Sequence, residues 1–156
     1  FEKRGGEGGA GMSAKQSFVG VWDLVSFEAR LSDGRVITPL GEDAVGRVIY
    51  DADGRMSVQI MRRDRPAFAS GDILKGESEE VRAAFEGYIA YSGTYEVQED
   101  DACVLHRVET SLFPNWIGGE QVRYFEFSGG RLKLSTPSFV YRGGETTSVL
   151  IWERAK

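Results

Sequence analysis

Short runs of alternating apolar and polar residues, separated by glycine-containing turns, are the feature that most constrains this fold. Segments 46–51 and 55–61 flank Asp53-Gly54, and an Asp-Gly pair between two apolar runs is a strong signal for a β-hairpin. Further turns of this kind lie at 32–34, 128–130 and 142–144. Because short turns join consecutive strands, we expect antiparallel neighbours in a meander.

The pattern predicts eight to ten strands in all. The clearest segments are 20–30, 35–38, 46–51, 55–61, 94–98, 102–111, 120–127, 131–136 and 145–154. A meander of this many twisted strands usually closes, because closure removes the exposed strand edges. We therefore expect an all-β fold, a closed antiparallel up-and-down barrel. A barrel of about eight strands leaves an interior that holds side chains plus one small ligand.

One segment has the period of a helix. Ser78 is the expected N-cap, and Glu79 and Glu80 follow it in the first turn, where negative charge suits the helix dipole. The apolar positions that follow have the spacing of one buried helix stripe: Val81, Ala84, Phe85 and Tyr88. Gly93 is expected to close this helical region.

Charge and cysteine content narrow the classes of partner and compartment. The chain has 156 residues, one domain's length, and a net charge of −5 with no stripe of Lys and Arg. This argues against nucleic acid or an anionic membrane as partner. With Cys103 as its single cysteine and no apolar stretch of membrane-spanning length, we expect a cytoplasmic protein.

The N-terminal residues differ in composition from the rest. Residues 1–12 are rich in glycine and run into Met12, the candidate native start. We expect residues 1–17 to be a flexible tail or a cloning remnant, and residues 18–156 to form the barrel domain.

The two ends of the barrel sequence carry a pair suited to closure. Gly20-Val21-Trp22 opens the first strand and Arg154 ends the last one, and an arginine can stack on a tryptophan ring. This Gly-x-Trp start with a terminal arginine resembles the lipocalin pattern. The resemblance implies that Trp22 and Arg154 close one barrel end and have a structural role.

Longer segments resemble the bacterial and fungal lipocalin-like domain family. The most specific ones are the run YIAYSGTY at 88–95 and PNW at 114–116, followed by Gln121-x-Arg123; the resemblance extends from about 18 to 154. It implies a small lipocalin-like β-barrel with one α-helix near a barrel mouth, but no single activity. One departure is Arg107, where the family often has a second histidine after the position of His106.

His106 and Arg123 are the principal site candidates. Strand alternation puts Arg123 on one face with Phe125 and Phe127, which indicates a cavity wall with a polar anchor. We expect His106 and Arg123 to hold a polar ligand group, and His106, the only histidine, is the catalytic candidate because it can move protons. Alternatively, His106 is satisfied by a backbone carbonyl or a carboxylate, and Glu28, in register with Trp22, neutralises Arg123.

Five further residues are candidates for ligand contact. Trp116 and Asn115 lie in a connection that can form a barrel rim, Tyr91 and Tyr95 can donate hydroxyls, and Gln59 can line a pocket. Four of them have a structural alternative: Trp116 can pack under its own loop, the two tyrosines can cap a corner, and Gln59 can face solvent.

Three functions fit this pattern. The first is binding of a small, partly apolar molecule, with a carboxylate or carbonyl, in the barrel cavity. The second is a cofactor-independent isomerase, cyclase or lyase that uses His106 and Arg123. The third is an interaction module with a filled barrel. We expect no cofactor, since no phosphate loop or dinucleotide fingerprint occurs, and no metal, since one histidine and one cysteine do not form a usual zinc set.

Overall fold

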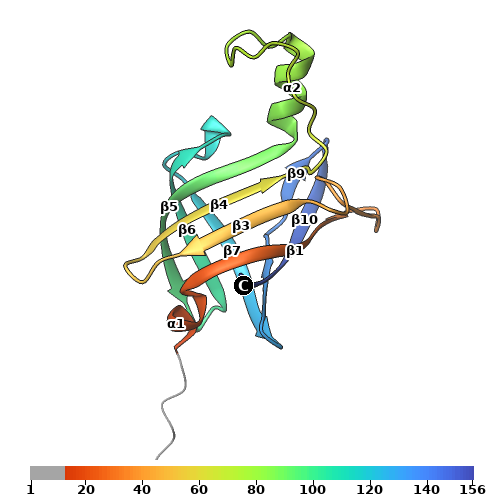
Figure 1. Ribbon diagram of the computed structural model, residues 1–156. Coiled ribbons are helices and arrows are strands. Elements are labelled where there is room, and N and C mark those ends of the chain that lie inside the picture. Colours follow the sequence, from red (N-terminus) through yellow and green to blue (C-terminus); the bar gives the residue numbers. More distant parts are fainter. Residues whose placement is uncertain (1–12) are drawn as a thin grey trace, which may run out of the picture.

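A computed structural model describes residues 13–156 and shows a closed antiparallel β-barrel (Figure 1). Within these residues the barrel strands are β1 Gly20–Leu31, β3 Val45–Tyr50, β4 Arg55–Met61, β5 Tyr88–Gln98, β6 Cys103–Ser111, β7 Glu120–Ser128, β8 Arg131–Ser135 and β10 Gly144–Arg154. Two short strands, β2 Val36–Ile37 and β9 Phe139–Tyr141, pair beside β1 and β10. The predicted all-β, up-and-down barrel is confirmed. Residues 1–12, expected to belong to a tail or cloning remnant, lie outside the described residues.

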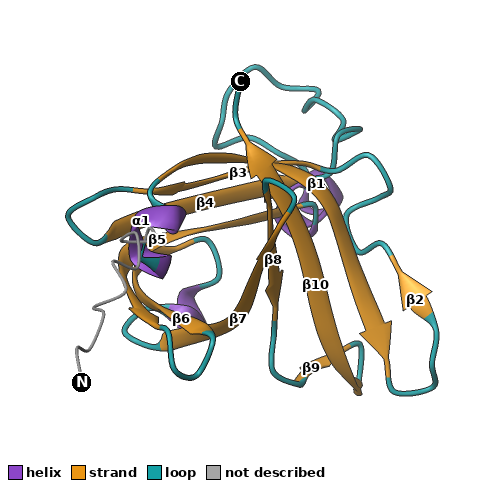
Figure 2. Cartoon of the chain, turned by 90° about the horizontal axis from the view of Figure 1, so that it is seen from below, coloured by secondary structure: helices purple, strands orange, loops and turns teal. Residues whose placement is uncertain are grey.

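Pairing of the first and last long strands closes the barrel, and Figure 2 shows β10 beside β1. The register runs from Trp22 opposite Arg154 to Leu31 opposite Thr146, with a bulge between Leu24 and Ser26. A bulge inserts one residue and shifts the alternation of faces that follows. Phe27 and Ala29 are therefore buried, whereas Glu28 between them is not.

The bulge in β1 determines the direction of the Glu28 side chain. A side chain between two inward-facing neighbours points away from the barrel interior. The alternative in which Glu28 neutralises Arg123 is therefore wrong. It rested on counting every second residue from Trp22, and the bulge between Leu24 and Ser26 breaks that count.

Helix α1, Ala14–Phe18, lies at the lower end of the barrel in Figure 1, within the stretch expected to be a tail. Ser13 caps it by accepting the Gln16 backbone N–H. Phe18 is fully buried and packs edge-on against Tyr50, Phe125 and Phe127. This end of the barrel is filled with aromatic side chains.

At this end Arg154 contacts both β1 and the C-terminal end of α1. Its guanidinium lies 4.3 Å from the centre of the Trp22 ring and donates to the carbonyl oxygens of Val19 and Ser17. The Trp22 Nε1–H donates to the Phe18 carbonyl at 2.9 Å. Gly20 has a φ of +137°, and a Cβ there would lie 2.7 Å from Arg154 Nη1. The positive φ, which L side chains rarely adopt, favours glycine at this position.

Helix α2, Ser78–Glu86, stands at the opposite end of the barrel (Figure 1). Two details of its prediction are wrong. Its N-cap is Glu77, whose N–H is bound by Glu80, and the helix ends at Gly87, not near Gly93. Gly93 lies within β5 at a bulge, where a Cβ would clash with the Arg107 carbonyl oxygen.

The apolar stripe of α2 is not buried, contrary to expectation. Val81 and Phe85 are 50% and 45% exposed. The helix projects from the barrel rim (Figure 1), and Phe85 is among the residues that line the cavity. Periodicity identifies a helix and its apolar face, but not what covers that face. No helix within residues 13–156 is long and apolar enough to cross a membrane.

Candidate functional site

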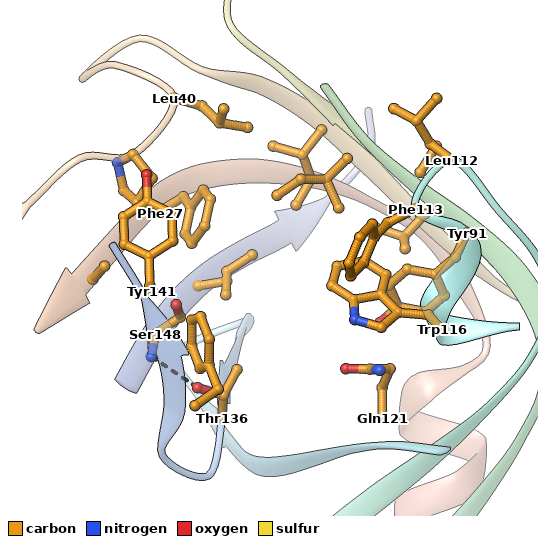
Figure 3. A pocket seen from close by; sticks show the side chains of 18 of the residues that line it. Phe27, Leu40, Tyr91, Leu112, Phe113, Trp116, Gln121, Thr136, Tyr141 and Ser148 are labelled. Atoms are coloured by element: carbon orange, nitrogen blue, oxygen red, sulfur yellow. Dashed lines mark hydrogen bonds between the residues drawn. The ribbon is translucent and has the colours of Figure 1, made fainter. Parts of the chain in front are cut away.

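A cavity of about 920 Å³ occupies the half of the barrel nearer α2. Its apolar wall comes from side chains on facing strands: Phe27, Val48, Val58, Ile60, Leu134, Leu150 and Trp152. Polar groups lie among them: Tyr91, His106, Gln121, Arg123 and Ser148. Figure 3 shows Phe27 and Ser148 on one side of this space and Tyr91 and Gln121 on the other. Such a mixture of mainly apolar wall and few polar groups is typical of small-molecule sites.

The cavity mouth is aromatic. The short 3-10 helix η1, Pro114–Trp116, carries Trp116, whose ring meets Tyr91 edge-on at 5.8 Å and Phe113 at 5.4 Å. Figure 3 places these three on one side and Phe27 and Tyr141 on the other. A flat molecule entering here would be flanked by rings.

His106, on β6, is linked to two tyrosines and is 2% exposed. Its Nε2 lies 2.8 Å from the Tyr50 hydroxyl of β3, and its Nδ1 lies 2.7 Å from the Tyr91 hydroxyl of β5. Both ring nitrogens are thus occupied by hydroxyls, not by a carbonyl or a carboxylate. Tyr91 lines the cavity, and Tyr50 does not.

Burial and a nearby cation keep this cluster neutral. Burial, followed by the charge of Arg123, lowers the pKa of His106 to about 3. Burial also raises the pKa of Tyr50 and of Tyr91, although the charge of Arg123 opposes both shifts. At neutral pH the imidazole and both phenols are uncharged, and Arg123 carries the charge of the group.

Arg123, on β7, has no carboxylate partner among the ion pairs of residues 13–156. Its guanidinium donates to the Val122 carbonyl at 2.8 Å and to Gln121 Oε1 at 3.2 Å. A guanidinium has five N–H donors, and these two hydrogen bonds to neutral oxygens leave others that can donate to an acceptor oxygen of a ligand.

The structure brings four of the predicted ligand residues to the cavity: His106, Arg123, Trp116 and Tyr91. Three others are not among the residues that line it. Gln59 lies between inward-facing neighbours and bonds Ser57, and Asn115 is exposed. Tyr95 is buried further along β5, where its hydroxyl donates to the Asp51 carbonyl at 2.6 Å. Because side chains alternate along β4, with Val58 and Ile60 directed inward, Gln59 cannot line the cavity wall.

Two residues near the site were not among the predicted ones. Tyr50 was detectable as an inward position in its strand, but its partner His106 lies 56 positions away. Trp152 is buried in the cavity wall, and its Nε1–H has no hydrogen-bond partner within the described chain. Only the closed barrel brings these residues together.

Comparison with known proteins agrees with this architecture. Residues 19–155 match the family of lipocalin-like domains. The chain is also similar to the 4'-hydroxy-3'-methoxypropiophenone carrier protein ppsC of Aspergillus oryzae, with 38% identity over 106 residues, which cover 64% of this chain and 96% of that protein.

Proposed function

Since this chain belongs to the lipocalin-like domain family, we propose that it binds a small, partly apolar molecule in its barrel cavity. The observation that carries the proposal is Arg123, a cation without a carboxylate partner in the described chain, within a mainly apolar cavity. A ligand with an oxygen acceptor at one end and an apolar body satisfies both features.

The similarity to a carrier protein supports the same class of ligand. Its named cargo, 4'-hydroxy-3'-methoxypropiophenone, is an aromatic ring with a ketone and small oxygen substituents. In this chain the rings of Phe113 and Trp116 suit the aryl part, and Arg123 with Tyr91 suits a carbonyl or carboxylate oxygen. We therefore propose aryl carbonyl compounds as the first ligands to test.

The alternative functions are less well supported. An enzyme in which His106 moves a proton needs a base that titrates near neutral pH, and the pKa of His106 is about 3. Its neighbours Tyr50 and Tyr91 have raised pKa values. A filled barrel is disfavoured by a cavity of about 920 Å³. Binding without chemistry agrees best with these observations.

The proposal includes a small-molecule partner in the cytoplasm. The acidic net charge of −5 supports this partner over nucleic acid. The lone thiol, Cys103, is buried and unpaired with another cysteine, as suits a reducing compartment.

Calorimetric titration with 4'-hydroxy-3'-methoxypropiophenone and with aryl carboxylic acids tests the function. We expect saturable binding to the native chain and at least about a tenfold loss in Arg123→Gln, because a charged hydrogen bond contributes about 1.5–3 kcal/mol. Arg107→Gln is the matched control, since Arg107 lies on the outer face and pairs with Glu96 at 2.8 Å. No binding to the native chain, or equal losses in both variants, would contradict the proposal.

A further inference from the structure

Two hydrogen bonds link the buried side chains of Tyr50, His106 and Tyr91, and the partners available to each group determine which atom donates in each bond. Tyr50 is 1% exposed, and within residues 13–156 its hydroxyl has one hydrogen-bond partner, His106 Nε2. A buried hydroxyl proton without an acceptor costs about 1–3 kcal/mol. The Tyr50 O–H therefore donates to Nε2, and Nε2 must be unprotonated.

The state of the imidazole follows from this. A neutral imidazole has one N–H, and with Nε2 as acceptor the proton lies on Nδ1. A doubly protonated ring is disfavoured, because burial and Arg123 both lower the pKa of His106. The Nδ1–H then donates across 2.7 Å to the oxygen of Tyr91.

Tyr91 is left with its own proton to donate. Its oxygen is occupied by the His106 N–H, and Tyr91 lines the cavity. Arg123, on the same wall, has only donors. Gln121 Oε1, an acceptor at this end, is already bound by Arg123. Tyr91 and Arg123 thus both present hydrogen-bond donors to the cavity.

We propose that Tyr50, acting through His106, holds Tyr91 as a hydrogen-bond donor, so that the cavity selects ligands with a bare acceptor oxygen over the corresponding alcohols. This inference rests on the proposed function and refines its ligand class. Tyr50 is a positioning residue, because it does not line the cavity. An alcohol can accept the Tyr91 proton, but its own proton then competes for an oxygen that Arg123 already uses.

The first test needs no ligand. The chain has one histidine, so a ¹⁵N-labelled sample gives a single pair of imidazole nitrogen signals. At neutral pH we expect the Nδ1–H tautomer, with an Nε2 that accepts a hydrogen bond. The Nε2–H tautomer, the form that a histidine side chain favours in water, would overturn the inference.

The second test compares two ligands that differ by one proton donor. Propiophenone carries a single oxygen, and reduction of its ketone gives the matched alcohol. We expect the ketone to bind at least about tenfold more tightly, which corresponds to about 1.4 kcal/mol. Equal affinities would overturn the inference while leaving the proposed function intact. Binding of neither compound would overturn the proposed function for aryl ketones, and the tautomer would still decide the role of Tyr50.

Two variants test whether the preference for the ketone depends on the Tyr50 hydroxyl. In Tyr50→Phe the hydroxyl that fixes the Nδ1–H tautomer is lost, so we expect both tautomers of His106 to be populated and the preference for the ketone to fall below about threefold. Tyr95→Phe is the control: its ring packs on Tyr50 with centres 4.9 Å apart, but its hydroxyl bonds the Asp51 carbonyl. A preference that survives Tyr50→Phe, or is lost equally in Tyr95→Phe, would contradict the assignment.

Discussion

The two ends of this barrel use aromatic residues in opposite ways. At the α1 end, Phe18 and Trp22 are fully packed, and Arg154 covers the Trp22 ring. At the α2 end, Phe113 and Trp116 line an open mouth and keep part of their surface exposed. Buried apolar surface contributes to stability, whereas surface left open is available to a ligand. We infer that stability depends on the first end and binding on the second.

The largest expected effect is at the packed end. Trp22→Ala removes a buried ring together with its hydrogen bond to the Phe18 carbonyl. We expect a loss of about 3–5 kcal/mol in the free energy of unfolding, measured by urea denaturation. A loss below about 1 kcal/mol, the range of surface substitutions, would show that this end is not a plug.

His106, between the two ends, makes stability depend on pH. Its pKa in the folded protein, about 3, lies below the ordinary 6.5. As pH falls below 6.5, the unfolded chain binds a proton first, so stability is present above 6.5 and is lost toward pH 3. We expect a slope of up to about 1.4 kcal/mol per pH unit. Denaturation of His106→Gln between pH 7 and 4 should show a smaller slope; an unchanged slope would contradict this assignment.

The Arg154 contacts are the next largest effect. Arg154→Met keeps an apolar chain but removes the cation over Trp22 and two hydrogen bonds, one to the Ser17 carbonyl of α1 and one to the carbonyl of its C-cap, Val19. We expect a loss of about 1–3 kcal/mol in unfolding free energy. Arg47→Met is the control, because the exposed Arg47–Asp23 pair should contribute below about 1 kcal/mol. Equal losses in the two variants would remove the special role of Arg154.

The smallest effect on stability is expected at the mouth. Trp116→Ala changes a half-buried rim residue, so we expect less than about 1 kcal/mol of destabilisation. The same variant should bind 4'-hydroxy-3'-methoxypropiophenone at least about tenfold more weakly, because it removes a ring that flanks the ligand. A large loss of stability with unchanged binding would reverse the roles that we assign to the two ends.

Strand alternation and turn residues predicted the barrel and the inward positions of His106 and Arg123. They failed where the backbone departs from regularity, as at the β1 bulge, which turns Glu28 away from the interior. They also failed where a partner is remote in sequence. The contact between Tyr50 and His106 depends on barrel closure, and no local pattern contains it. The exposed stripe of α2 shows the same limit, since a helical period does not reveal what lies opposite.

The three tryptophans allow a direct test of the division between the two ends. Trp22 lies at the packed end, Trp116 at the mouth and Trp152 in the cavity wall. Titration of ¹⁵N-labelled protein with 4'-hydroxy-3'-methoxypropiophenone reports on each indole N–H separately. We expect the Trp116 and Trp152 signals to shift and saturate together while the Trp22 signal stays in place. Shifts confined to Trp22, or equal small shifts of all three, would contradict binding in the cavity.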